Sequence, residues 1–144
     1  MSLEKLIEEG NKFEVPQEVI DDRIAKIKSF VDKFPLENLP NLKLEEFVQG
    51  TDENSFCYWL EFKKIGFGIG GGNASKFGIY RTLHNNEPTY VIKYGKNKEY
   101  LDEQAAQQYY SELIQKIIKA LELVKSDEVG KIKDLDIPMF NTVI

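Results

Sequence analysis

The chain has 144 residues, enough for one domain with a buried core, and 42% of them are hydrophobic, which excludes a disordered polypeptide. No stretch approaches the roughly 18 consecutive apolar residues of a membrane-spanning helix, and no signal-peptide core is apparent near the N-terminus. One cysteine, Cys57, and one histidine, His84, exclude an internal disulfide and a Cys/His zinc cluster, and they fit a reducing, cytoplasmic setting.

The net charge of −5 is unevenly distributed along the chain. Residues 63–98 contain seven Lys or Arg residues and one Glu, a net charge of +6, so the remainder carries −11. A basic segment between acidic flanks indicates a localised anionic partner. The alternative is that these lysines only protect strand edges against aggregation.

The first predicted element is a helix over residues 16–34, because apolar residues recur there at helical spacing and Pro16 suits a first turn. Two prolines then interrupt the pattern, a short helical turn is expected around residues 44–47, and TDEN at 51–54 is typical of a turn. The apolar residues of the helix are Val19, Ile20, Ile24, Ile27, Phe30, Val31 and Phe34.

From Ser55 the apolar pattern changes to a period of two, which predicts strands. In SFCYWLEF, residues 55–62, one face of the strand would carry Phe56, Tyr58, Leu60 and Phe62. The other face would carry Cys57, Trp59 and Glu61. Further strands are expected at GFGIG, KFGIYRT and PTYVIKY, with LHNNE as a hairpin loop between the last two. We therefore expect an antiparallel sheet of about four strands within residues 55–94.

A long helix is predicted for residues 99–125, with a broad apolar stripe that packs against the sheet. The expected fold class is α+β, an antiparallel sheet flanked by an N-terminal and a C-terminal helix. The sequence closes with the apolar LDIPMFNTVI. We expect residues 1–144 to form a single domain that is a fragment of a longer chain.

The glycine-rich stretch contains Gly66-x-Gly68-x-x-Gly71, the spacing of a dinucleotide-binding loop. Such a loop needs a helix N-terminus after it to hold the phosphate, whereas here NASKFGIYRT predicts a short loop and a strand. We expect instead a loop that another backbone approaches closely, and no cofactor. Its residues are Gly70, Gly71, Gly72 and Asn73.

Patterns for catalysis are weak. His84 lies in a polar turn, and a Cys57–His84 dyad would require the two side chains to meet across the sheet. The Glu61-x-Lys63 pattern occurs in nuclease metal sites, but no partner acid precedes it at a convincing spacing. A binding domain is expected rather than an enzyme, with no metal site, and a nuclease is the less favoured alternative.

Aromatic and basic residues are interleaved between residues 58 and 94. Basic side chains bind the phosphate backbone, and aromatic rings stack on a base that has left the duplex. Aromatic residues in strands also pack into cores, so the exposure of Trp59 separates the two interpretations.

The segment FPLENLPNLKLEEFVQGTDENSFCYWLEFKKIGFGIGGGNASKFGIYRT resembles the N-terminal segment of McrB-like proteins, the AAA+ GTPases of modification-dependent (type IV) restriction systems. The resemblance rests on the leucine-rich lead from Leu39 to Phe47, on SFCYWLE, on the glycine-rich turn and on KFGIY. The closing LDIPMFNTVI extends it, so that it covers residues 34–144.

The resemblance implies a DNA-binding specificity module that serves an AAA+ motor in the same chain and a separate nuclease subunit. It implies recognition of modified DNA, with methylated cytosine as one candidate base. The base would be flipped into an aromatic pocket formed by Trp59 and Tyr80. The basic segment then predicts the phosphate contacts. The alternative is a non-catalytic adaptor that docks a motor or a partner protein. The predicted phosphate-binding residues are Lys63, Lys64, Lys76, Arg81 and Lys93.

Overall fold

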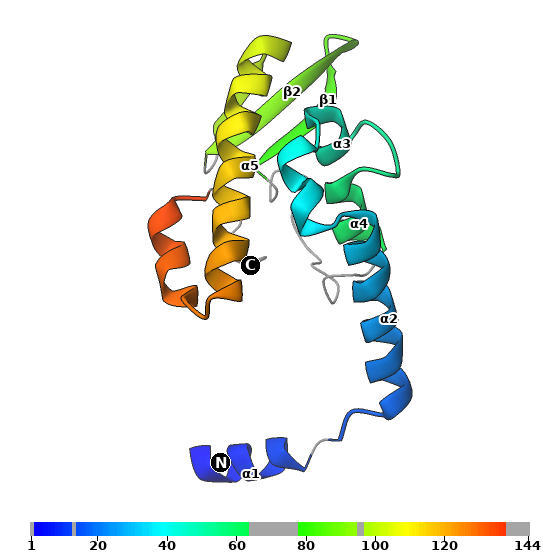
Figure 1. Ribbon diagram of the computed structural model, residues 1–144, viewed down its shortest axis with the longest axis vertical. Helices are drawn as coiled ribbons and strands as arrows, with labels where there is room; N and C mark the ends of the chain where they lie inside the picture. The colour runs from blue at the N-terminus through cyan, green and yellow to red at the C-terminus, as the bar shows by residue number, and fades with distance from the viewer. Residues whose placement is uncertain (1, 13, 64–77, 95–96, 138–144) are drawn as a thin grey trace.

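The computed structural model describes residues 2–12, 14–63, 78–94 and 97–137, with the side chains of all of these except residues 6, 11, 93 and 94. A long helix lies against a three-stranded antiparallel sheet, and shorter helices pack beside both (Figure 1). The α+β class predicted from the sequence is confirmed.

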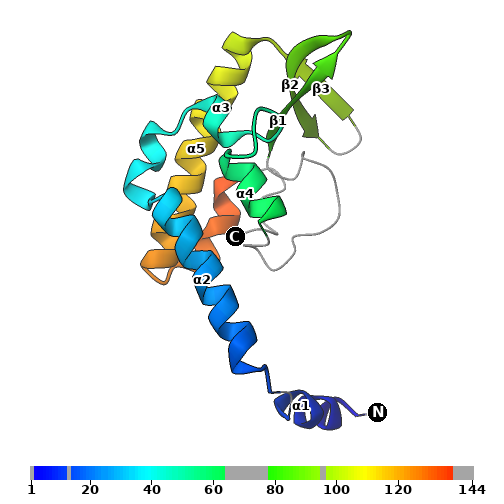
Figure 2. The ribbon, with the colours of Figure 1, turned by 90° about the vertical axis from the view of Figure 1, so that its right-hand side faces the viewer.

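Two helices form the N-terminal part, α1 (Leu3–Asn11) and α2 (Gln17–Lys33). The Ser2 hydroxyl caps α1 by accepting a hydrogen bond from the backbone N–H of Lys5. Helix α2 confirms the helix predicted for residues 16–34. It runs away from the rest of the molecule, and α1 lies at its far end (Figures 1 and 2).

A short 3₁₀ helix, η1 (Leu36–Asn41), and one helical turn, α3 (Leu44–Phe47), follow α2 and lead into α4 (Phe56–Phe62). The prediction of a strand at residues 55–62 is therefore wrong. The buried Ser55 hydroxyl accepts a hydrogen bond from the N–H of Tyr58 and starts a helix. Apolar residues two apart are also four apart, so Phe56 and Leu60 share a helix face as readily as a strand face.

The sheet consists of β1 (Ile79–His84), β2 (Glu87–Tyr94) and β3 (Asn97–Leu101), in the order β1-β2-β3. The strands predicted at KFGIYRT and PTYVIKY correspond to β1 and β2, while GFGIG lies outside the described residues. Asn85 and Asn86 join them with φ angles of 52° and 63°, which confirms the hairpin loop as a turn with two left-handed residues. The described sheet thus has three strands over 79–101, instead of about four over 55–94.

Helix α5 (Glu103–Lys125) begins four residues later than predicted. The carboxylate of Asp102 accepts a hydrogen bond of 2.8 Å from the N–H of Ala105 and caps the helix there. Residues 97–101 pair with β2, so residues 99–101, expected to be helical, belong to a strand instead. The 3₁₀ helix η3 (Val129–Leu135) then runs beside α5 (Figure 1).

The hydrophobic core joins these elements through a series of aromatic rings. The ring of Phe56 on α4 lies 5.2 Å from those of Phe30 and Phe34 and 5.4 Å from that of Phe47. Phe47 in turn contacts Tyr110 on α5 at 5.3 Å. The end of α2 is therefore anchored to α5 through α3 and α4. No helix within the described ranges is both long enough and apolar enough to cross a membrane.

Candidate functional site

The sheet has two faces with different surroundings. Ile79 and Ile92, opposite each other in the register, are buried in the same core as α5. Side chains alternate along a strand, so Tyr80 lies on the other side, which we call the outer sheet face. By the register it carries Tyr80, Thr82, His84, Glu87, Thr89, Val91, Lys98 and Tyr100. Tyr80 and Arg81, both predicted to contact DNA, therefore point to opposite sides of the sheet.

Arg81 is held on the α5 side. Its backbone N–H donates a 2.9 Å hydrogen bond to the carbonyl of Gln49, and its guanidinium carbon lies 5.8 Å from the centre of the Tyr90 ring. The Nε atom is buried and has no hydrogen-bond partner in the described part of the chain. Arg81 thus contributes to packing as well as carrying charge.

Carboxylates surround this arginine. A pocket of about 440 Å³ is lined by Arg81 together with Glu87, Asp102 and Glu103, and Thr89 and Tyr100 of the outer sheet face also line it. Burial raises the pKa of Tyr90 at the same pocket, the Arg81 charge opposes that rise, and Glu45 and Glu103 add to it. The local potential is mixed, so this pocket is poorly suited to a phosphate.

The outer sheet face carries an exposed aromatic pair. The rings of His84 and Tyr100 are stacked, with centroids 4.0 Å apart and planes inclined by 28°. Tyr100 is 46% exposed. Tyr80 and Tyr100 both lie opposite Val91 in the register, one on each neighbouring strand, so a row of side chains crosses all three strands. Tyr80 is half-buried and Val91 fully buried.

A basic residue follows on the same face. Lys98 is exposed and lies two residues before Tyr100 on β3, and its Cα partner in the register is Lys93 of β2. Tyr100 belongs to the segment that was predicted as helix, and Lys98 was counted in the basic segment 63–98 but not among the predicted phosphate-binding residues, so sequence reasoning did not name either as a site residue. The available signal was the capping residue Asp102, which separates them from α5.

Trp59 lies on α4 and not on the sheet. It is half-buried, with its ring edge-on to that of Phe34 at 6.0 Å and the Lys33 Nζ 4.9 Å from its centroid. Its indole Nε1 is buried without a hydrogen-bond partner among the described residues. Lys63, the exposed residue that ends α4, donates its N–H to the carbonyl of Trp59. The predicted residues outside the described ranges are Lys64, Gly70, Gly71, Gly72, Asn73 and Lys76, together with the side chain of Lys93.

The catalytic alternatives lose their predicted context. Glu61 and Lys63 are at the end of a helix, whereas the nuclease pattern needs them on a strand. Cys57 is fully buried on α4, and His84 is exposed at the end of β1. Within the described ranges no group of three His, Cys, Asp or Glu side chains is placed to hold a metal ion.

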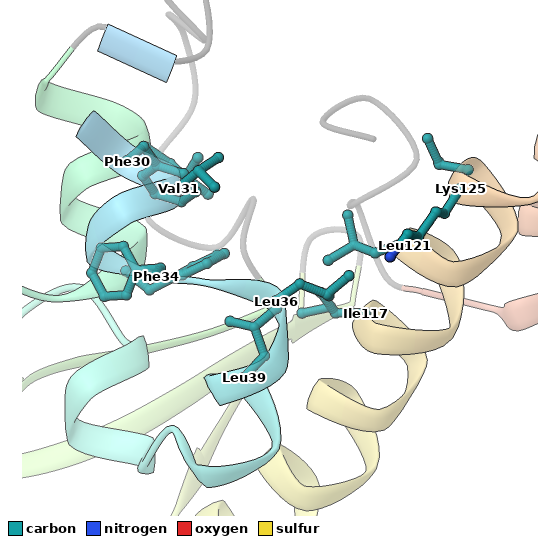
Figure 3. Close-up of a pocket in the computed structure, with 11 residues that line it drawn as sticks. Phe30, Val31, Phe34, Leu36, Leu39, Ile117, Leu121 and Lys125 are labelled. Atoms are coloured by element: carbon teal, nitrogen blue, oxygen red, sulfur yellow. The ribbon is translucent and has the colours of Figure 1, made fainter. Parts of the chain in front are cut away.

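A second feature lies between α2 and α5. A cavity of about 550 Å³, which we call the apolar groove, has side chains of α2 and η1 on one side and of α5 on the other (Figure 3). Lys125 is the only charged residue among the described residues that line it. The sequence placed the apolar residues of α2 in a helix but could not show that the helix leaves them uncovered. The groove is lined by Phe30, Val31, Phe34, Leu36, Leu39, Phe56, Leu60, Ile117, Leu121, Val124 and Lys125.

Comparison of the chain with family models, with curated proteins and with solved structures finds no match.

Proposed function

We propose that this domain is a DNA-recognition module that contacts DNA through the outer sheet face. The observation that carries the proposal is the exposed stack of His84 and Tyr100 beside Lys98. An aromatic pair on a sheet surface has a large area available for stacking on bases, and it needs a reason to remain exposed. Tyr80 and Tyr100 frame the base in this arrangement.

The register supports an anionic ligand. Lys98 and Lys93 occupy directly opposite positions in β2 and β3. Lys98 is exposed, and its positive charge favours an anionic ligand on this face. The net charge of +6 over residues 63–98 acts in the same direction, because each neutralised phosphate releases counterions.

The wider role follows from the resemblance to McrB-like proteins. The ligand is then modified duplex DNA, with methylated cytosine flipped out of the helix as one form of recognition, and the GTPase motor and nuclease act elsewhere. Trp59 stays a prediction as a stacking residue, and the phosphate contacts of the five predicted basic residues stay predictions too. The domain itself is a binding domain in this proposal.

The test is a titration of labelled duplexes with and without 5-methylcytosine, followed by fluorescence anisotropy. Tyr100→Ala is expected to weaken binding about 5-fold or more, the effect of losing one stacked base. Lys98→Ala is expected to weaken binding on all sequences and to lower the slope against the logarithm of salt by about 1. Lys119→Ala, exposed on α5 and paired with Glu122, is the matched control. Equal affinities for the wild type, Tyr100→Ala, Lys98→Ala and Lys119→Ala would overturn the outer sheet face as the DNA-binding site. If the wild type bound none of the duplexes, the proposed DNA-binding function would be overturned.

A second candidate function is protein docking, the adaptor alternative, and the apolar groove favours it. A cavity of about 550 Å³ with one charged residue has the character of a protein-binding groove. It opens beside a helix that has no buried residue. The occupant of this surface can be argued from the residues of α2 themselves.

A further inference from the structure

Helix α2 exposes a continuous apolar stripe. Ile24 is 58% exposed and Val31 52%, and none of the 17 residues of the helix is buried. Helices in proteins derive most of their stability from packing of an apolar face, yet only the last turn of α2 contacts the core, through Phe30 and Phe34. The stripe therefore lacks the surface against which it would normally pack.

The spacing of the stripe identifies the kind of surface that fits it. Its residues follow one another at intervals of four, three, four and three, which is the heptad repeat of a coiled coil, with Ile24 and Val31 at the a positions. Branched side chains at these positions are typical of helices that pair with another helix. The stripe residues are Ile20, Ile24, Ile27, Val31 and Phe34.

The flanking charges select the partner and its direction. In this heptad Asp21 and Lys28 occupy the e positions and Arg23 a g position, and e and g residues set orientation in coiled coils. An antiparallel pair of identical α2 helices brings Asp21 close to Lys28 of the second copy, and does so twice. A parallel pair would instead bring Arg23 close to Lys28 of the second copy, a like-charge contact repeated twice.

The same antiparallel alignment matches the apolar residues. Ile24 faces Ile27 of the second copy, and Ile20 faces Val31 of the second copy, so these four layers are apolar on both sides, while Phe34 faces Gln17 of the second copy. One surface that is complementary to itself satisfies the geometry of a twofold dimer. A second copy of this chain is therefore the occupant that both the charges and the layers favour.

The apolar groove continues the stripe, because Phe30, Val31 and Phe34 line it (Figure 3). In an antiparallel pair the N-terminal end of the second α2 lies at this end of the first, followed by the second α1. Helix α1 exposes Leu3 to 73% and Ile7 to 54%. Within one chain α1 lies at the end of α2 that is farther from the groove (Figures 1 and 2).

We propose that two copies of this chain associate through antiparallel α2 helices, and that each copy places the apolar side of its N-terminal segment in the groove of the other. The inference rests on the second candidate function, protein docking, and it is independent of DNA binding.

The experiment is sedimentation equilibrium of the 144-residue chain over a range of concentrations. We expect a mass of twice 16.6 kDa at high concentration. Ile24→Glu is expected to give a monomer with an unchanged circular dichroism spectrum, because this side chain is exposed within one copy. Leu83→Glu places the same charge at a residue that is 68% exposed on β1, and this control should still dimerise.

Charge reversal tests the direction. Lys28→Asp places two aspartates opposite each other in the antiparallel pair and is expected to raise the dimer dissociation constant about 3- to 10-fold. Adding Asp21→Lys to this variant should restore the original value. In a parallel pair Lys28→Asp would strengthen the dimer instead, and that result would overturn the proposed geometry.

A wild-type chain that stays monomeric at all concentrations would overturn the self-association. If Ile24→Glu then also lowered the thermal stability, the stripe would be covered within one chain, which would contradict the docking function as well. If its stability were unchanged, only the second copy as occupant would be wrong. A dimer that persists in Ile24→Glu would exclude α2 as the interface.

Discussion

The hydroxyl of Tyr110 on α5 donates a 2.6 Å hydrogen bond to the backbone carbonyl of Leu42, which lies 68 positions earlier in the chain. Tyr110 is only 2% exposed, and the bond that it makes is partly buried. Leu42 belongs to the segment between η1 and α3, which has no regular hydrogen-bonding pattern at that point. The bond therefore fixes an irregular segment to the longest helix.

Replacement of Tyr110 by Phe tests this bond. The ring and its packing against Phe47 are retained, while the carbonyl of Leu42 loses its partner in a buried position. We expect Tyr110→Phe to lower the free energy of unfolding by about 1–2 kcal/mol, measured by urea denaturation. Tyr100→Phe removes a hydroxyl from an exposed tyrosine and is expected to change it by less than about 0.5 kcal/mol. Equal effects would contradict the structural role.

The same residue predicts a dependence on alkaline pH. Burial raises the pKa of Tyr110 above its ordinary value, with smaller contributions from Cys57, Glu46 and Glu45. The folded state thus favours the neutral phenol of Tyr110. The contribution of this side chain to the free energy of unfolding is complete below a pH of about 10 and is lost as the pH rises further. The wild type should lose stability more steeply than Tyr110→Phe between about pH 9 and pH 11. Identical slopes would contradict the raised pKa.

Gly50 predicts a severe effect of one methyl group. Its φ angle is +99°, and a Cβ atom there would lie 2.1 Å from the carbonyl oxygen of Arg81, a backbone atom that cannot move away alone. We expect Gly50→Ala to destabilise the protein by at least about 2 kcal/mol, seen as a lower thermal midpoint. Gly130→Ala adds the same methyl where no other atom lies within 4 Å and should have little effect. A wild-type midpoint for Gly50→Ala would contradict the position of the 48–50 segment against β1.

Tryptophan fluorescence distinguishes the two possible stacking surfaces. Trp59 is the only tryptophan, and it lies on α4 with its ring beside Lys33, whereas Tyr80 and Tyr100 lie on strands of the sheet. DNA bound through Tyr80 and Tyr100 is therefore expected to leave its emission nearly unchanged in a titration that anisotropy shows to be saturated. Strong quenching would instead support stacking on Trp59, as the sequence predicts, and would count against the sheet as the site.

The elements that the sequence predicts well are those determined by local signals. Helix α2 has a regular helical period, and the turn at Asn85 and Asn86 uses residues that tolerate a left-handed backbone. Helix α4 differs, because its seven residues are nearly all apolar and fit a period of two as well as contacts four residues apart. Its conformation depends on the Ser55 cap and on packing of Phe56 against three other rings, two of them on α2 and one on α3.

The candidate site was also predicted only in part, because some of its features depend on tertiary packing rather than on local sequence. The basic and aromatic character of β1 is visible in the sequence, but the sides to which Tyr80 and Arg81 point follow from the position of α5. Tyr100 and Lys98 were missed because strand β3 is defined by its pairing with β2 rather than by its own composition. Pairing between strands is a tertiary property, so a single sequence pattern does not contain it.

Aromatic contacts fix helix α2 to the core at one end only. Phe30 and Phe34 hold one end in the core, while the remaining turns project from the molecule (Figure 1). For a helix of this length, a tilt of about 10° at the base displaces the far end by about 4 Å. A force on the free end of α2 is therefore amplified at Phe56. The series of aromatic rings then passes it on to Tyr110.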